Sequence, residues 1–509
     1  MKTKTLIRAV GLLLSALVGG TWQMDARQLK VLAIGNSFSQ DAVEQNLWEL
    51  AFAQGDTLVV GNAFIGGCSI DRHWQNALTG DSAYVYRKIV MGRRDAHPNT
   101  PLGAILKDEP WDIVTLQQVS QFSGDSTTYG HLPDLMDYVR TTLQRDSVPL
   151  WWHLTWAYPQ HSKSQHFKTL YHGDQLVMYR AILETADSLL PRVGIGRRVP
   201  TGVAIQRARR AVGDILNRDD IHLSFNEGRY AAACTWCEAL TGRSVLGNAY
   251  HPKAVNAKMA SILQSAAHKA VMNDSLGWGD SLRVLWLGTR STFYAGVPQM
   301  VEGLARSQGM KLSMTRMLKA PDTPPTAFLG DTALARLLEQ GCWDYVVIQE
   351  SAPGAESLPK AAASRSYPYD RRLDEEVLAS SPDARILCYN TWQQGRSHVP
   401  RDYPMLSTGW QAQRTQLRAS RPHAASPASP LRRAPWMVEV GDAWREAYLS
   451  RPKMSLYDKR RHQPTPEGNY LTACSILRAI LEHPFSSSYT AGIPDATARF
   501  LQQVAQDER

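Results

Sequence analysis

The sequence predicts an α/β protein of 509 residues, built on a doubly wound, flavodoxin-like sheet with helices on both faces in three α/β/α layers. Short apolar runs, typical of buried parallel strands, alternate with longer stretches that have the apolar spacing of amphipathic helices. Several of these runs end in glycine or polar residues, as strands do where they meet functional loops. The pattern starts again in the second half, so we expect the fold to be present twice.

The first half contains five expected strands. The apolar run Val31–Ile34 is too short for a helix and is followed by Gly35, which favours a buried strand. A helix with one apolar face is expected at Ala42–Gln54. The polar stretch Asp71–Lys107 is assigned to the wall of a pocket. The other expected elements are strands at Gly55–Ile65, Trp111–Leu116, Ser147–Trp156 and Arg198–Val203, and helices at Leu132–Leu143, Gln175–Leu190, from Ala204 onward, and Glu227–Leu240.

Length and composition give the domain organisation. A chain of 509 residues is too long for a single core. We expect a signal peptide at residues 1–26, a catalytic domain at 27–275 and a second, non-catalytic domain at 281–509. The net charge is +9, but the basic residues are scattered and not interleaved with aromatic ones, so no nucleic-acid partner is expected. The oligomeric state is left open.

The N-terminus predicts export. Met1–Gly20 has a basic start, an apolar stretch and then small residues, which is typical of a secretory signal and too short for a transmembrane anchor. No cysteine follows it closely, so we expect a secreted or periplasmic protein without a lipid or membrane anchor. Six cysteines are too few for a disulfide scaffold. Cys234 and Cys237 have redox spacing but are expected to be buried thiols, and no metal or organic cofactor is expected.

The turn after the first strand contains the candidate nucleophile. Ser37 follows Gly35 and Asn36 in a strand-to-helix turn, where a hydroxyl is exposed at the carboxyl edge of the sheet beside a helix N-terminus. The same position suits a serine that only caps the helix, and Ser37 alone does not decide between the two.

Other segments expected at the same edge would complete the chemistry of acyl transfer. A serine nucleophile needs a base, and His222 can take its proton if Asp219, three residues earlier, holds the imidazole in one tautomer. The amides of Ser37 and Gly67 and the side chain of Gln117 can donate hydrogen bonds to an oxyanion. Each residue alone also fits a structural role, as a tight turn, a helix cap or a surface histidine. Together they favour a catalytic site.

Matches in one order, about 240 residues apart, predict a duplicated domain. The clearest pairs are Leu29–Gly35 with Leu282–Gly288, and His222–Cys234 with His462–Cys474. The second copy lacks the chemical residues. Arg290 stands where the first copy has Ser37, unless one inserted residue brings Ser291 into register. We therefore expect the second domain to be a non-catalytic partner.

At these residues the sequence resembles the SGNH hydrolases. Gly35–Ser39 looks like their GDSL-type nucleophile block, with Asn36 for the usual Asp, and Asp219–His222 looks like the DxxH block that carries the other two triad members. Gly67 looks like their oxyanion glycine. The resemblance covers about Leu29–Ala270 and is closest to a secreted bacterial branch of the superfamily.

The third block departs from the usual pattern. Most SGNH hydrolases have an Asn there, whereas this chain has Gln117 followed by Gln118. A Gln in this block is similar to the sialate O-acetylesterase-like branch. We choose Gln117 as the oxyanion donor and keep Gln118 as the alternative.

These residues and the resemblance together imply a secreted serine esterase that removes acyl groups, acetyl above all, from carbohydrate. Ser37, His222 and Asp219 form the expected triad, with Gly67, Gln117 and the Ser37 amide as the oxyanion hole. A small-molecule or glycan ester is the expected partner, and residues available to bind it are Asn36, Gln118, His73 and Trp156. The alternatives are a lipid or thioester hydrolase with the same triad, or a non-catalytic glycan-binding protein built from two hydrolase-like domains.

Overall fold

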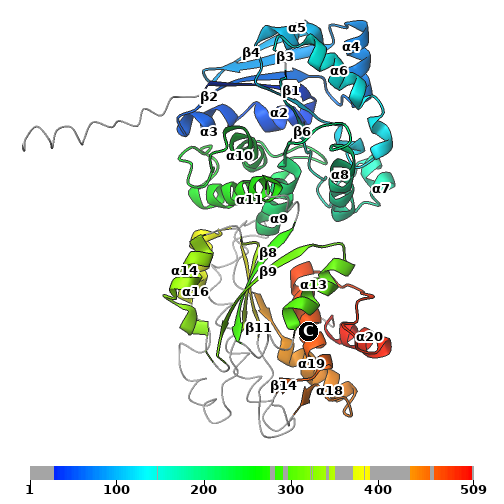
Figure 1. Cartoon of the computed structure of the whole chain (residues 1–509), viewed down its shortest axis with the longest axis vertical. Helices are drawn as coiled ribbons and strands as arrows, with labels where there is room; N and C mark the ends of the chain where they lie inside the picture. Colours follow the sequence, from blue (N-terminus) through cyan, green and yellow to red (C-terminus); the bar gives the residue numbers. More distant parts are fainter. Residues whose placement is uncertain are drawn as a thin grey trace, which may run out of the picture.

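The computed structural model describes residues 28–145, 147–275, 281–289, 296–320, 323, 325–339, 343–349, 371–382, 384–389, 436–458 and 463–506 (Figure 1). These residues form two α/β units, each around its own sheet. The expected signal peptide lies outside the described residues, as do Arg290, Ser291 and His462.

A seven-stranded sheet forms the centre of the first unit and confirms the α/β fold that the sequence predicts. Its strands are β1 (Gln28–Gly35), β2 (Thr57–Phe64), β3 (Tyr84–Val90), β4 (Arg93–Thr100), β5 (Ile113–Leu116), β6 (Leu150–His153) and β7 (Arg198–Val199). Their order across the sheet is β4-β3-β2-β1-β5-β6-β7, and β1 pairs in parallel with both β2 and β5. The chain therefore builds outward in both directions from β1. In doubly wound sheets, ligands bind beside the carboxyl ends of the strands at such a point.

Helices cover both faces of this sheet (Figure 1). One group packs together on the side of β1 and β2 and contains α2 (Ser37–Val43), α3 (Leu47–Ala53), α9 (Thr201–Val212), α10 (Glu227–Thr241) and α11 (Ala257–Ser275). The other group contains α4 (Ile70–Thr79), α5 (Leu102–Asp108) and α6 (Leu132–Thr142), and the unit also has α7 (Gln165–Leu170) and α8 (Gln175–Leu189). In the part of the chain that is described, no helix is both long and apolar enough to cross a membrane.

The structure corrects the single helix predicted at Ala42–Gln54. Two short helices, α2 and α3, replace it, and Asn46 between them has a left-handed backbone with φ of 68°. An α-helix cannot continue through that conformation, which Asn tolerates better than most residues. The Tyr250 hydroxyl donates to the Asn46 side chain at 2.9 Å, and Arg94 donates to the Glu44 carbonyl at 2.7 Å. These tertiary contacts hold the break in place.

The polar stretch Asp71–Lys107, for which no strand or helix was predicted, contains the β3–β4 hairpin and most of α4 and α5. β3 pairs antiparallel with β2, so the sheet is mixed and not purely parallel as predicted. β4 is an edge strand whose residues are almost all exposed. An exposed edge strand has no need of apolar residues, so its sequence carried no strand pattern.

The second unit has a five-stranded sheet between two helical layers. Its strands are β8 (Leu282–Thr289), β9 (Leu312–Lys319), β10 (Tyr345–Gln349), β11 (Arg385–Tyr389) and β12 (Trp436–Val438). Alternate residues of β8 enter different apolar clusters: Val284 and Trp286 lie in one, and Leu285 and Leu287 in the other. The helices of the first cluster are α13 (Val297–Ser307), α18 (Val440–Ser450), α19 (Pro466–Leu481) and α20 (Asp495–Val504), and those of the second are α14 (Thr332–Glu339) and α16 (Arg371–Ser380).

The two units share several structural details. The order β9-β8-β10-β11-β12 corresponds strand by strand to β2-β1-β5-β6-β7. Asp344 accepts a hydrogen bond from the Arg283 amide at 2.8 Å, as Asp112 accepts one from the Lys30 amide at 2.9 Å. These equivalent contacts accompany the sequence matches, while common ancestry of the two halves stays a prediction.

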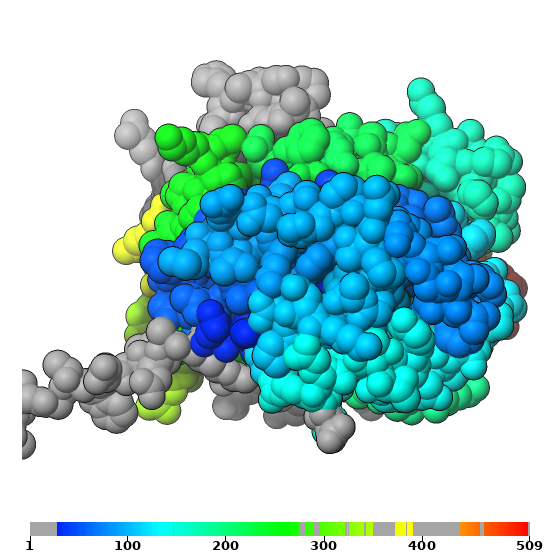
Figure 2. All heavy atoms as spheres, turned by 90° about the horizontal axis from the view of Figure 1, so that it is seen from above, coloured from blue at the N-terminus to red at the C-terminus, as the bar shows by residue number. Residues whose placement is uncertain are grey.

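Buried charges join the two units. Arg207 on α9 donates to the Asp344 carboxylate, and Arg210 lies 3.6 Å from the same oxygen. Lys269 on α11 donates to the Trp343 carbonyl. Although burial opposes it, the charges of Arg207, Lys269 and Arg210 hold the pKa of Asp344 below its usual value. Viewed from the end, the first unit covers most of the visible surface and the second lies largely behind it (Figure 2).

We expect Arg207→Ala to lower the free energy of unfolding by about 3 kcal/mol, because it leaves the buried Asp344 carboxylate short of its main partner. Arg192→Ala is the matched control, since Arg192 is exposed and has no ion pair in the described chain. It should change stability by less than about 0.5 kcal/mol. Urea unfolding of the full chain measures both, and equal stabilities of the two variants would contradict a stabilising role for this pair.

Candidate active site

The turn after β1 places Ser37 at the first position of α2. Asn36 caps the helix, and both Asn36 and Phe38 are buried, whereas Ser37 is only half-buried. A Cβ atom on Gly35 would lie 2.7 Å from the Ser39 hydroxyl and 2.9 Å from the Gln117 side chain. Only glycine fits there, because such contacts are too close for any side chain. The turn is thus packed tightly around the one serine that solvent can reach.

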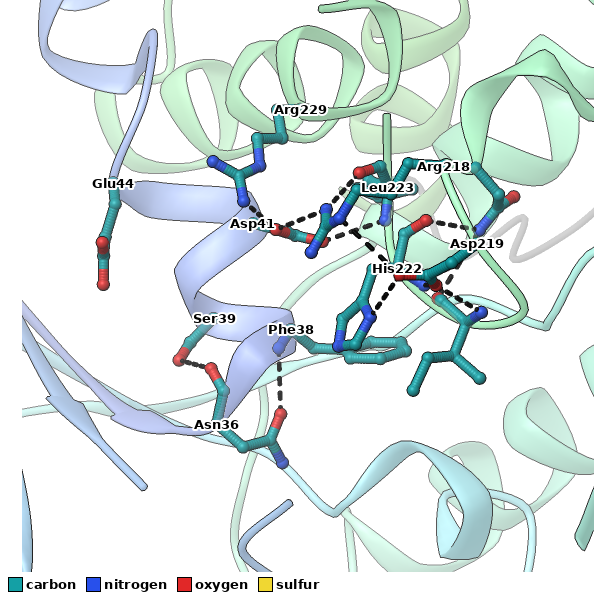
Figure 3. Close-up of polar contacts among 12 residues, drawn as sticks. Asn36, Phe38, Ser39, Asp41, Glu44, Arg218, Asp219, His222, Leu223 and Arg229 are labelled. Carbon is teal, nitrogen blue, oxygen red and sulfur yellow. Dashed lines mark hydrogen bonds and ion pairs between the residues drawn. The ribbon is translucent and has the colours of Figure 1, made fainter. Parts of the chain in front are cut away.

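Asn36 holds three segments together. Its side-chain oxygen accepts from the Phe38 amide at 3.0 Å and from Gln117 Nε2 at 2.9 Å, and its Nδ2 donates to the Cys68 carbonyl at 3.0 Å. The start of α2, the exit of β5 and the Gly66–Cys68 turn therefore meet at one amide (Figure 3 shows its bond to Phe38). Asn36 is 1 % exposed, so in this structure its side chain links these three segments and does not make the predicted contact with substrate.

Gln117 lies directly beneath the turn. Its Oε1 is 2.7 Å from His153 Nδ1, while one hydrogen of its Nε2 is used by Asn36. The second hydrogen on Nε2 remains available to another acceptor. His153, at the end of β6, was not singled out from the sequence, because one histidine in an apolar strand carries no distinctive spacing.

Gly67 lies in the exposed turn between β2 and α4, with φ of +60°. That left-handed conformation favours glycine. The next residue, Cys68, is the one whose carbonyl Asn36 holds. Among the described residues, neither the Gly67 amide nor the Ser37 amide has a hydrogen-bond partner. Two backbone donors thus remain free on segments that Asn36 ties together.

The Asp219–His222 loop has the geometry of a base and its orienting group. Asp219 Oδ1 accepts from the amides of Ile221 and His222 at 2.9 and 2.6 Å, and Oδ2 lies 2.9 Å from His222 Nδ1. Burial opposes ionisation, but these hydrogen bonds and the imidazole together hold the pKa of Asp219 below its usual value. Because the carboxylate only accepts, His222 Nδ1 carries a hydrogen, and in the neutral imidazole this places the lone pair on Nε2.

Asp41 fastens this loop to α2. Its buried carboxylate accepts from the Leu223 amide at 2.9 Å, from Arg218 at 2.9 and 3.1 Å, and from Arg229 at 2.6 Å (Figure 3). Asp41 lies four residues after Ser37 on the same helix, so the loop that carries His222 is attached to the element that carries the serine. This contact was not predicted from the sequence. One indication was present in the sequence: Asp41 is an acidic residue that stands between Phe38 and the apolar residues of the predicted amphipathic helix.

Aromatic contacts place His222 next to the serine turn. The rings of Phe38 and His222 lie 6.1 Å apart, and Trp156 stacks on Phe38 at 4.0 Å. Trp156 Nε1 also donates to the Ile221 carbonyl at 3.0 Å. Phe38 directly follows Ser37, so the structure brings the two predicted motifs together at the carboxyl edge of the sheet (Figure 3).

Three residues suggested for substrate binding are enclosed in the protein. Gln118 accepts from the Ile70 amide at 3.0 Å and donates to the Thr128 carbonyl at 2.9 Å, which braces two loops. His73 contacts the Tyr84 hydroxyl at 2.9 Å and is 1 % exposed, and Trp156 is fully buried. Each of the three side chains is held by contacts inside the protein, so this structure gives them supporting roles in place of the predicted contact with substrate.

Burial raises the pKa of the Cys68 thiol to about 12 although Arg72 opposes the shift, which disfavours the thiolate that a cysteine nucleophile needs. Within the described ranges, no group of three or more His, Cys, Asp or Glu side chains is placed to hold a metal ion.

Residues 30–270 match the model of DUF4886, described as a domain of unknown function. A crystal structure of a DUF4886 family protein from Bacteroides uniformis is 43% identical, covers 48% of this chain and 95% of its own, and has a TM-score of 0.47. A protein from Slackia heliotrinireducens described as a candidate SGNH hydrolase is 17% identical over 42% of this chain and 99% of its own, with a TM-score of 0.28. A gut microbial diltiazem-metabolizing enzyme is 13% identical over 42% of this chain and 47% of its own, also with a TM-score of 0.28. No curated protein matches the chain significantly.

We expect Asp41→Ala to lower the free energy of unfolding by about 3–5 kcal/mol, because it leaves two arginines and the Leu223 amide without their buried acceptor. Asp81→Ala is the matched control, since Asp81 is exposed and its side chain has no partner among the described residues. Urea unfolding measures both variants. Equal stabilities would show that Asp41 does not hold the loop.

Acid should destabilise the first unit through its buried histidines. Burial lowers the pKa of His73 and of His153 to about 3, whereas a histidine in the unfolded chain titrates near pH 6.5. The unfolded chain therefore binds more protons between these values. The free energy of unfolding falls as the pH falls from about 6.5 toward 3, by up to about 1.4 kcal/mol per pH unit for each histidine.

Urea unfolding at pH 7, 6 and 5 checks this dependence. His73→Asn should reduce the slope by up to about 1.4 kcal/mol per pH unit. A variant with the wild-type slope would mean that His73 is protonated in the folded protein as readily as in the unfolded one.

Proposed function

Because the chain belongs to the DUF4886 family through residues 30–270, and the description of that family names no activity, we propose a function from the site itself. The protein is a hydrolase that cleaves esters, with Ser37 as the nucleophile of a Ser-His-Asp mechanism. The observation that carries this proposal is the Asp219–His222 pair, which is docked beside Phe38 with Nε2 of the imidazole free to accept a proton.

The reaction proceeds in two halves. His222 Nε2 takes the Ser37 hydroxyl proton while Oγ bonds to the ester carbonyl carbon, and Asp219 stabilises the imidazolium. The tetrahedral intermediate collapses as the C–O bond to the alcohol breaks, and the alcohol leaves with the proton from His222. Water then attacks the acyl-serine with the same base and releases the acid.

The negative oxygen of the intermediate needs donors that are already in place. The Ser37 and Gly67 amides and the second Nε2 hydrogen of Gln117 supply three, and Asn36 links the segments that carry them. Losing one such donor typically costs about 3–4 kcal/mol of transition-state stabilisation. Fixed donors avoid the cost of reorganising solvent during the reaction.

We assign an acetylated carbohydrate as the substrate class. This finer proposal is supported by the resemblance of the Gln117 block to the sialate O-acetylesterase-like branch of the SGNH hydrolases, and by the export that the N-terminus predicts. The second unit acts as a duplicated, non-catalytic partner. Thr289 stands there at the position of Asn36, and Arg290 at that of Ser37.

We expect Ser37→Ala to lower turnover of acetylated sugars and p-nitrophenyl acetate by at least about 10³-fold, because it removes the nucleophile. Ser188→Ala, an exposed serine on α8, is the matched control and should keep the wild-type rate. Arg290→Ala should also leave the rate unchanged. Acetate release and p-nitrophenol absorbance measure the three variants.

Turnover of p-nitrophenyl esters with acyl chains of increasing length separates the remaining possibilities. A strong preference for long acyl chains would move the substrate to lipids, and thioester turnover would extend it to thioesters. Wild-type protein that binds glycans but hydrolyses no ester faster than Ser37→Ala would contradict the proposed enzyme and favour a binding protein.

A further inference from the structure

We propose that His153 is a positioning residue of this site: together with Asn36, it fixes which end of the Gln117 amide faces the Ser37 turn. This inference rests on the proposed function and deepens it. Neither the motifs around Ser37 nor the Asp219–His222 loop includes His153, which lies 116 residues after Ser37 on a different strand.

The orientation of each side-chain amide in this network follows from two backbone groups whose role as donor or acceptor is fixed. The Phe38 amide can only donate and the Cys68 carbonyl can only accept, so Asn36 must direct Oδ1 to the first and Nδ2 to the second. Because Asn36 Oδ1 is an acceptor, Gln117 must direct Nε2 toward it at 2.9 Å. Gln117 Oε1 then lies on the side of Gly35, 2.9 Å from where a Cβ atom of that residue would be, and needs a donor.

His153 supplies that donor from inside the protein. Its Nδ1 lies 2.7 Å from Gln117 Oε1, and burial lowers the pKa of the ring to about 3, so the imidazole is neutral and carries one hydrogen. Nε2 is buried with no hydrogen-bond partner in the described part of the chain. A hydrogen on Nε2 would therefore be left without an acceptor, which favours the tautomer with the hydrogen on Nδ1.

The orientation matters for the oxyanion. With His153 donating, Gln117 keeps its NH₂ group toward Asn36, and the hydrogen that Asn36 does not use is the one that the proposed mechanism directs to the oxyanion. With the amide reversed, a carbonyl oxygen would face Asn36 Oδ1 and the developing negative charge. Both contacts would be repulsive, so the reversed amide is unproductive. Without the His153 donor, Gln117 adopts this reversed orientation more readily.

The second unit contains the same glutamine without the histidine. Gln349 Oε1 lies 2.9 Å from the Cβ position of Gly288, as the Gln117 side chain does from that of Gly35. Tyr389 pairs with Gln349 at the end of β11, where the first unit has His153 at the end of β6.

In both units Oε1 of the glutamine lies 2.9 Å from the Cβ position of the glycine, but the partner of that oxygen differs. Gln349 Oε1 accepts from the Thr289 amide at 2.9 Å in the turn after β8. Gln117 Oε1 lies 2.7 Å from His153 Nδ1, and its Nε2 donates to Asn36, the residue equivalent to Thr289. The neighbours of the glutamine therefore decide which donor its oxygen meets.

The test uses the full chain and p-nitrophenyl acetate. We expect His153→Phe to lower kcat by about 10²-fold with KM changed less than about threefold, because a transition-state donor is lost while substrate binding is kept. His153→Asn, which places an amide N–H near the position of Nδ1, should restore kcat to within about fivefold of wild type. Trp236→Phe, which changes packing against the His153 ring, should keep the wild-type kcat.

Wild-type kcat in His153→Phe would overturn the proposal. So would a folded His153→Asn protein, checked by circular dichroism, that is no more active than His153→Phe, because a purely structural role would not depend on the N–H donor.

An NMR measurement tests the arrangement without activity. In protein with ¹⁵N-labelled histidine, the His153 signals, identified by their loss in His153→Phe, should report a hydrogen on Nδ1 and none on Nε2 from pH 5 to 8. The Nε2–H tautomer, or an imidazolium at pH 6, would overturn the proposal. If the tautomer is as expected but no ester is hydrolysed through Ser37, the proposed function fails while the positioning of Gln117 stands.

Discussion

The carboxylate of Asp41 is the contact on which the arrangement of the site depends. It is completely buried and accepts hydrogen bonds from the Leu223 amide and from Arg218 and Arg229. Leu223 is 182 positions away in the sequence, so this one side chain holds a loop from a distant part of the chain against α2. Removing one partner of a buried ion pair costs about 3–5 kcal/mol, which is enough to hold His222 in place against the conformational freedom of an exposed loop.

Asn36 makes the complementary connection at the other end of the helix. Its amide links Phe38, Gln117 and the turn that contains Gly67, because one side chain can both donate and accept. Asp41 and Asn36 together gather four separate segments around a helix of seven residues. The same short helix leaves Ser37 accessible at its first position. The candidate site is thus assembled by buried polar contacts, while the apolar core supplies the sheet on which they rest.

The sequence predicted the elements whose side chains are buried in a regular pattern. The first strand, the helix after Asp174 and the helix from Glu227 agree with the structure to within a few residues, because apolar spacing records burial. The β3–β4 hairpin was missed because β4 is an exposed edge, and the break between α2 and α3 because Asn46 is fixed by tertiary contacts. Ser37, Gly67 and Gln117 could be found by their positions after strands, and the Asp219–His222 pair by its spacing. Asp41 and His153 could not, since a single buried polar residue shows its partners only in three dimensions.

The most direct measurement is the site and rate of modification by a fluorophosphonate, which reacts with an activated serine as the Oγ–P bond forms and fluoride leaves. Peptide mapping by mass spectrometry after reaction at neutral pH should locate one phosphonyl group on Ser37. The same reaction should be at least about tenfold slower in Asp41→Asn, because His222 is no longer held beside the serine. Modification at another residue, no modification, or an equal rate in the variant would contradict the account.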